Sequence, residues 1–295
     1  METKSDVIRW DERVSSALRF NRPDASSDPK ASPQWRGSRR SLAKALAPLE
    51  GIARESIRLS RNHGAGFENG GETYYLPGYI FSGPRGGDEP LRIGVFAGIH
   101  GDEPEGVHAL AQLLGQLERD PDLALGYRLF AYPICNPTAF EDGTRHSRSG
   151  KDLNREFWRD SSEPEVRLLE SELAAQAFHG IVALHTDDTS HGFYGFARGA
   201  TLTRHLIEPA LRAAEEFLPR NGERRIDGFR ARNGIIREGY EGVLRAPPKA
   251  RPRPFEIILE TPQSPPVYLK EAALVAALRA ILVHYREFIA YAANL

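Results

Sequence analysis

The order of apolar and polar positions divides the chain, from about residue 73 onward, into alternating strand-like and helix-like segments. Short apolar runs typical of strands lie at 73–81, 91–99, 127–135, 180–185 and 255–260. Helical periodicity occupies 105–119, 163–178, 202–218 and 268–289. Several of the strands are apolar throughout, which is typical of strands covered on both sides. The pattern therefore predicts an α/β sheet with helices on both faces.

The N-terminal part of the chain has a different composition. Residues 21–40 are rich in Pro, Ser and Arg and contain few aliphatic residues, so we expect 1–40 to be a poorly ordered or loosely packed extension. A helix is predicted within 39–56, with Pro48 as its weak point, and 41–295 are expected to form a single domain. Further along, Ser162 and Glu165 have capping-box spacing at the start of the helix predicted over 163–178.

Composition excludes several classes of protein. The 295 residues include 27% charged residues, and the formal net charge is −1, which argues against binding to nucleic acid or to a membrane surface. A single cysteine, Cys135, excludes an internal disulfide and a Cys-rich zinc site, and it is interpreted as a small buried hydrophobe. No apolar run is long enough for a signal peptide or a membrane helix. We therefore expect a cytoplasmic protein, and the sequence leaves its oligomeric state open.

Polar residues gather where the predicted strands end. His100, Asn136, His185 and Glu260 each follow or close an apolar run. Ligands of open α/β sheets bind beyond the carboxyl ends of the strands. These strand ends are therefore the place to look for function.

Two of these strand ends carry metal-ligand chemistry. The H-x-x-E spacing of His100 and Glu103, in a glycine-rich turn, allows an imidazole and a carboxylate to meet on one ion. A solvated turn is the alternative interpretation. His185 is the natural third ligand, unless it is a hydrogen-bonded structural histidine. Glu260 is costly to bury unless it is paired or functional, and beside a metal-bound water it is suited to act as a general base.

The block at 136–157 adds cationic groups. Arg145 and Arg155 can bind a carboxylate with two parallel hydrogen bonds, and a guanidinium near a reacting carbonyl can stabilise an oxyanion. A basic, solvated loop is the alternative for this block.

Five short motifs together resemble a known family. HGDE at 100–103, NPTAF and TR within 136–145, DLNREF at 152–157, LHT at 184–186 and LETP at 259–262 have the order seen in zinc carboxypeptidases of the carboxypeptidase A clan. The likeness covers roughly 75–290 and is greatest to the bacterial branch that includes murein peptide amidase. It implies a mixed, largely parallel twisted sheet. Ser147 departs from the family pattern, because asparagine is usual two residues after the arginine.

The resemblance also implies a role for each site residue. His100, Glu103 and His185 would bind one Zn²⁺ per chain, and Asp152 would hold His100 in place. Arg145 would polarise the scissile carbonyl, Asn154 and Arg155 would bind the terminal carboxylate of the substrate, and Glu260 would be the general base. Tyr240 is the candidate for the mobile tyrosine that covers the substrate in carboxypeptidases.

Two enzyme classes share this metal signature. Carboxypeptidases and peptide amidases remove a C-terminal residue, whereas succinylglutamate desuccinylase and aspartoacylase remove an acyl group from an amino acid. Only 35 residues follow Glu260, whereas the deacylases carry an added β-rich domain there, so we favour the peptidase class. The expected substrate is a small peptide or an acyl amino acid. A relative that binds a ligand without turnover is the third possibility, disfavoured by the complete set of site residues.

Overall fold

The computed structural model describes residues 39–87, 89–198 and 202–292. The strands are β1 (Leu59–Arg61), β2 (Gly66–Asn69), β3 (Glu72–Tyr75), β4 (Tyr79–Ser82), β5 (Leu91–Phe96), β6 (Tyr127–Tyr132), β7 (Gly180–Asp187), β8 (Tyr194–Arg198), β9 (Arg225–Ile226), β10 (Phe229–Arg232), β11 (Ile235–Ile236) and β12 (Phe255–Pro262). The α-helices are α1 (Leu42–Glu55), α2 (Glu105–Arg119), α3 (Pro137–Asp142), α4 (Pro164–Ala175), α5 (Leu202–Ala214) and α6 (Val267–Ala292), and a 3₁₀ turn covers Leu153–Arg155.

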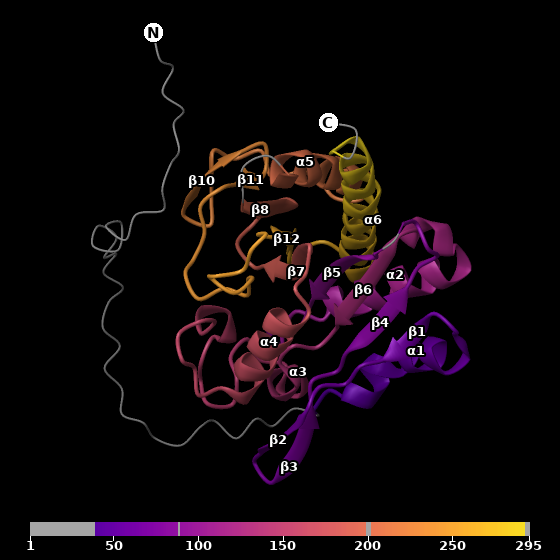
Figure 1. Cartoon of the computed structure of the whole chain (residues 1–295). Helices are drawn as coiled ribbons and strands as arrows, with labels where there is room; N and C mark the ends of the chain where they lie inside the picture. The colour runs from indigo at the N-terminus through magenta and orange to yellow at the C-terminus, as the bar shows by residue number, and fades with distance from the viewer. Residues whose placement is uncertain (1–38, 88, 199–201, 293–295) are drawn as a thin grey trace. The chain divides into compact units, whose positions relative to one another are not determined.

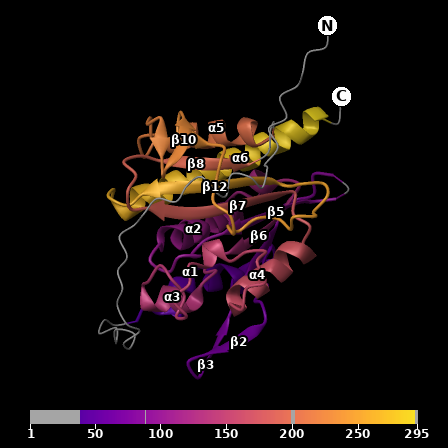
Figure 2. The same cartoon turned by 90° about the vertical axis from the view of Figure 1, so that its left-hand side faces the viewer.

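The centre of the molecule is a mixed ten-stranded sheet in the order β1-β4-β6-β5-β7-β12-β8-β11-β10-β9. The four central strands β6, β5, β7 and β12 are parallel to one another, while β4 and β8 flank them in the antiparallel direction. The strands β2 and β3 form a separate hairpin that projects from the body in both views (Figures 1 and 2). This arrangement confirms the predicted fold class.

Both faces of the central sheet are buried because alternate side chains of each strand enter different cores. Val95 and Leu184 belong to the core shared with α1, α2, α5 and α6, while Phe96 and Ile181 belong to the core shared with α4. The helix α6 packs along α5 and α2 (Figures 1 and 2). Double burial explains why the central strands are almost continuously apolar in sequence.

Some sequence predictions were wrong in detail. The run at 73–81 is split into β3 and β4 around Pro77–Gly78, since proline lacks the N–H that a continuous strand would use. The short strands between β7 and β12 carry too little periodicity to be recognised. The predicted helix within 39–56 is present as α1, with Pro48 inside it.

The capping box predicted at the start of α4 does not form. The N-cap residue is Glu163, without a side-chain capping bond, and the helix starts at Pro164. Glu165 instead turns inward and accepts a hydrogen bond from Thr138 Oγ1 at 3.2 Å. Spacing alone therefore placed the cap one residue too early.

The structure describes only the last two residues, Arg39 and Arg40, of the expected N-terminal extension. Residues 1–38 of that predicted segment lie outside the described residues. Arg40, the last residue of the segment, is packed onto the domain, because its backbone N–H donates to Glu141 O at 2.8 Å and its guanidinium donates to Gly101 O at 2.6 Å.

No helix within the described residues combines the length and apolar character needed to cross a membrane.

Candidate active site

The predicted site residues converge at the carboxyl ends of three adjacent parallel strands. His100 lies in the loop after β5, His185 lies near the end of β7, and Glu260 lies near the end of β12. The parallel pairing of β12 with β7 places Glu260 directly opposite His185. Parallel strands bring their carboxyl ends to one edge of the sheet, so the chain places polar side chains there without interrupting its apolar core.

His100, Glu103 and His185 form a buried cluster of metal-ligand type. Glu103 Oε1 lies 2.6 Å from His100 Nδ1, Glu103 Oε2 lies 3.0 Å from His185 Nδ1, and the two Nδ1 atoms are 3.3 Å apart. All three residues are at most 6% exposed. Ligand atoms about 2.0–2.1 Å from a tetrahedral zinc lie roughly 3.4 Å from one another, so the imidazole spacing fits such an ion. In the part of the chain that the structure describes, this is the one group of three such ligands.

The loop that carries the first two ligands depends on glycine. Gly98 has φ +60°, a left-handed conformation that glycine adopts without strain. At Gly101, a Cβ atom would lie 2.0 Å from the carbonyl carbon of Ala139, so any side chain would collide with α3. The two glycines let the loop turn sharply and press against α3, which brings Glu103 back over His100.

Asp152 contacts the other side of the His100 ring. Its Oδ1 lies 3.1 Å from His100 Nε2, and its Oδ2 accepts from Arg145 Nη2 at 3.1 Å. Arg145 Nη1 is in turn 3.3 Å from His100 Nδ1. A carboxylate on the outer imidazole nitrogen fixes the tautomer in which the inner nitrogen is free to bind a metal.

Burial and the neighbouring charges shift the pKa values of the three cluster residues. Burial alone would lower the pKa of His100, but the nearby carboxylates of Glu103 and Asp152 raise it to about 8. Burial opposes ionisation of Glu103, yet His100 and His185 lower its pKa to about 2. Burial dominates at His185 and lowers its pKa. The cluster therefore contains the ionised Glu103 carboxylate beside the neutral His185 imidazole, both forms that bind metal ions, whereas His100 must lose a proton to bind one.

Glu260 lies beside the cluster, but its carboxylate takes no part in the hydrogen bonds that join the cluster residues. No hydrogen bond or ion pair reaches its side chain from any residue that the structure describes. Burial raises its pKa well above the usual value, and the carboxylates of Glu103, Asp187 and Asp227 add to the effect. A half-buried carboxylate without a fixed partner, on the strand beside a metal-ligand cluster, is available to exchange a proton.

Asn154, Arg155 and Tyr240 lie around this cluster. Asn154 is buried, with its Nδ2 3.4 Å from His185 Nε2 and its Oδ1 accepting from Leu244 N at 2.9 Å. Both ends of its amide are thus engaged by the protein, an arrangement that favours holding the His185 ring over binding a substrate. The Arg155 guanidinium lies over the Tyr240 ring, 4.0 Å from its centroid. The Tyr240 hydroxyl donates to Asp227 Oδ1 at 2.8 Å, so the tyrosine supports Arg155 in this conformation.

Sequence reasoning missed Thr186, which contacts the cluster, and Lys270, which lies behind it. The Thr186 N–H donates to Glu103 Oε2 at 3.1 Å, and its hydroxyl donates to Glu105 Oε2 at 3.2 Å. Lys270 of α6 pairs with Glu105. Thr186 could have been identified from the sequence, because it directly follows the predicted ligand His185. Nothing in the local pattern of α6 distinguishes Lys270 from a solvated lysine.

Comparison with known proteins agrees with this geometry. Residues 91–221 match the family described as the succinylglutamate desuccinylase/aspartoacylase catalytic domain. This stretch contains the cluster His100, Glu103 and His185 but ends before Glu260. No curated protein sequence matches the chain.

Solved structures share the fold. A candidate metallopeptidase from Shewanella baltica superposes with a TM-score of 0.67 at 21% identity, covering 82% of this chain and 91% of that one. A metallo-carboxypeptidase from Burkholderia cenocepacia gives 0.63 at 18% identity, with coverage of 85% and 70%. A metallo-carboxypeptidase from Pseudomonas aeruginosa, in complex with (2-guanidinoethylmercapto)succinic acid, gives 0.62 at 18% identity, with coverage of 84% and 70%. The chain therefore has the metallocarboxypeptidase-like fold, and its residues 91–221 are similar to the succinylglutamate desuccinylase/aspartoacylase catalytic domain.

Proposed function

We propose that the protein is a zinc-dependent hydrolase that cleaves an amide bond next to a carboxylate, as a metallocarboxypeptidase or peptide amidase does. One Zn²⁺ per chain would be held by His100, Glu103 and His185. The observation that carries this proposal is the buried cluster of three ligand atoms with the unpaired Glu260 carboxylate on the neighbouring strand. A zinc ion bound there supplies Lewis-acid chemistry, which lowers the pKa of a water molecule and polarises a carbonyl.

The remaining residues have roles in proton transfer and charge stabilisation. Glu260 takes a proton from the attacking water as the carbon–oxygen bond forms, and it delivers that proton to the leaving nitrogen as the carbon–nitrogen bond breaks. Arg145 donates to the carbonyl oxygen as negative charge develops on it. The Arg145 side chain is 41% exposed, so its guanidinium can face a substrate while Asp152 holds one of its edges.

Arg155 is the residue that we assign to substrate recognition. Arg155, supported by Tyr240, is proposed to bind the carboxylate of the substrate. Asp152 and Asn154 are proposed to hold the two imidazoles from outside the cluster. The metallo-carboxypeptidase from Pseudomonas aeruginosa is in complex with a substituted succinic acid, and we infer a small carboxylate-bearing substrate here as well.

A specific observation favours a second candidate, an N-acyl amino acid deacylase. The family match over 91–221 is to deacylases. Both candidates hydrolyse an amide whose nitrogen belongs to a carboxylate-bearing amino acid. They therefore share one site and differ in whether the acyl side of the bond is a peptide or a simple acyl group.

The experiment that tests the function measures metal content and amine release together. Protein purified without chelator is expected to contain close to one zinc per chain, and zinc added after chelator treatment should restore activity. A panel of C-terminal peptides, murein tripeptide and N-acyl amino acids then separates the two candidates. Zinc below about a tenth of an equivalent, with no recovery on adding zinc, refutes the metalloenzyme proposal. Turnover of acyl amino acids alone would replace the peptidase by the deacylase.

A further inference from the structure

A buried ion pair lies beneath the active site. Lys270 of α6 and Glu105, the first residue of α2, are 3% and 6% exposed and are bonded to each other. Lys270 also donates to Gln263 O at 3.2 Å, just beyond the end of β12. The neighbouring positions of α6 that face the core are apolar, including Ala273 and Leu274. A buried ion pair at such a place seldom stabilises a fold more than apolar residues would, so its presence requires another explanation.

The pair connects to the candidate metal ligands through one threonine. Glu105 Oε2 accepts from the Thr186 hydroxyl at 3.2 Å, and the Thr186 N–H donates to Glu103 Oε2 at 3.1 Å. Thr186 also follows His185 directly in the chain. One residue therefore lies between the ion pair and two members of the cluster.

The same threonine reaches the strand that carries Glu260. The hydroxyls of Thr186 and Thr261 are 3.0 Å apart, and Thr261 Oγ1 donates to His185 O at 3.3 Å. Thr261 follows Glu260 and lies opposite Thr186 in the pairing of β12 with β7. The ends of these two strands are thus joined by side-chain bonds as well as by the backbone ladder.

We propose that Lys270 and Glu105 are positioning residues for the metal centre: through Thr186 they fix the Glu103 carboxylate and the ends of β7 and β12. The proposal rests on the proposed zinc site. Lys270 touches no reacting group. It holds the Glu105 carboxylate in the position where that carboxylate accepts the hydrogen bond of the Thr186 hydroxyl. Such outer contacts are worth about 10–100-fold in metal affinity in other zinc proteins.

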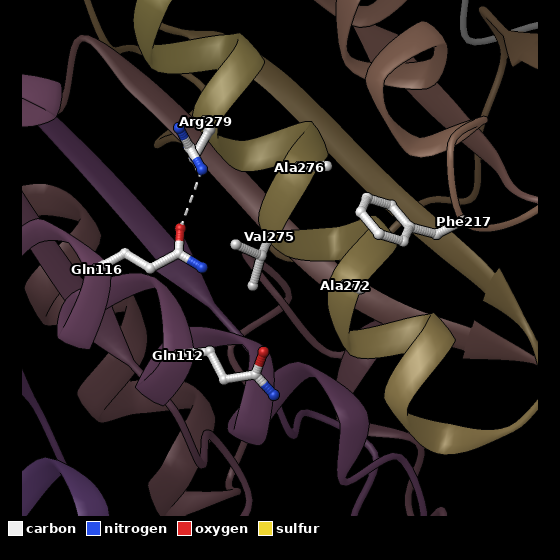
Figure 3. A pocket seen from close by; sticks show the side chains of 7 residues that line it. All are labelled: Gln112, Gln116, Phe217, Ala272, Val275, Ala276 and Arg279. Atoms are coloured by element: carbon white, nitrogen blue, oxygen red, sulfur yellow. Dashed lines mark hydrogen bonds between the residues drawn. The ribbon is translucent and has the colours of Figure 1, made fainter.

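The outer part of the contact between α2 and α6 offers a matched control. Arg279 of α6 donates to Gln116 of α2 at 3.3 Å, beside the shallow pocket lined by Phe217 and Val275 (Figure 3). This pair joins the same two helices, but it is exposed and contacts no residue of the site. Arg279→Met therefore tests the docking of the helices without the connection to the cluster.

The test measures zinc affinity, by competition with a chromogenic chelator, and the visible spectrum of the Co²⁺-substituted protein. Thr186→Val, which keeps the shape of the side chain without its hydroxyl, should weaken zinc binding at least tenfold and shift the Co²⁺ bands. Thr186→Ser should restore both. Because Lys270→Met leaves a buried carboxylate unpaired and can unfold the protein, the double variant Glu105→Leu/Lys270→Met is used to remove both charges.

A merely structural ion pair predicts a different result. In that case the double variant and Thr186→Val would shift the melting temperature but bind zinc within twofold of the wild type, as Arg279→Met is expected to do, and the proposal would be overturned. Wild-type protein that binds no zinc would instead refute the proposed function, and this inference with it.

Discussion

Glu260 and His185 are direct partners in the parallel pairing of β12 with β7. Side chains of directly opposed residues emerge on the same face of a sheet, so the Glu260 carboxylate and the His185 imidazole lie on one side of it. One side chain belongs to the metal-ligand cluster, and the other has no hydrogen-bond partner among the described residues. The β-ladder therefore sets the distance between the proposed metal site and the proposed general base.

Glu260→Gln is expected to lower kcat by a hundredfold or more, because an amide of the same size cannot accept the proton of the attacking water. Zinc content should remain that of the wild type, since Glu260 is not one of the three clustered ligands. The measurement is amine release with the best substrate of the panel, together with metal analysis.

Glu256→Gln is the matched control for this variant. Glu256 lies on the same strand, four residues before Glu260, and its Oε1 accepts from Ala246 N at 3.0 Å. The glutamine oxygen can still accept that bond, so activity should change little. Near-normal activity of Glu260→Gln would exclude the base role.

Asp152→Asn is expected to weaken zinc binding by about 10–100-fold. The carboxylate lies 3.1 Å from His100 Nε2 and also binds Arg145, so its loss frees the imidazole to rotate. Asp142→Asn provides the control, because Asp142 pairs with Arg148 at 2.7 Å elsewhere in the same part of the chain. Equal zinc affinity in both variants would contradict the role of Asp152.

The sequence predicted the part of the site that follows from strand ends. His100, His185 and Glu260 each close an apolar run, and parallel strands bring such ends together. Lys270 could not be found this way, because it is 165 positions from Glu105 and the pair forms only when α6 packs on α2. Asn154 was assigned to the substrate because the family resemblance implied that role. Its burial against His185 depends on Leu244, whose position no local pattern reveals.

Tyr240 offers a test of how Arg155 is held. Its ring supports the guanidinium at 4.0 Å, and its hydroxyl bonds Asp227. If the ring is the important part, Tyr240→Phe should raise KM about twofold or less and Tyr240→Ala several-fold, since a partly exposed cation–π contact is worth about 0.5–1 kcal/mol. Equal losses in kcat for both variants would instead favour direct contact of the hydroxyl with the substrate.

Glu165 should make the stability of the protein depend on pH. Burial raises its pKa above the usual value of 4.5, and its Oε2 has no hydrogen-bond partner among the described residues. The folded state disfavours the ionised form, so this carboxyl lowers the free energy of unfolding as the pH rises through its unfolded pKa, and the loss is complete above its folded pKa. Glu165→Gln removes the charge and should raise the melting temperature at pH 8, with a smaller gain towards pH 4.5.

The neighbouring Glu163 is the control for this prediction. It is also buried at the start of α4, but its Oε1 accepts from Ser149 Oγ at 2.8 Å and lies 3.8 Å from Lys151 Nζ. Glu163→Gln removes a partnered charge and should lower the melting temperature at pH 8. Thermal unfolding of both variants and the wild type is measured across this pH range. At pH 8 the melting temperature should rise in Glu165→Gln and fall in Glu163→Gln. A Glu165→Gln gain that does not grow with pH would show that the ionised carboxylate is not what costs stability at this position.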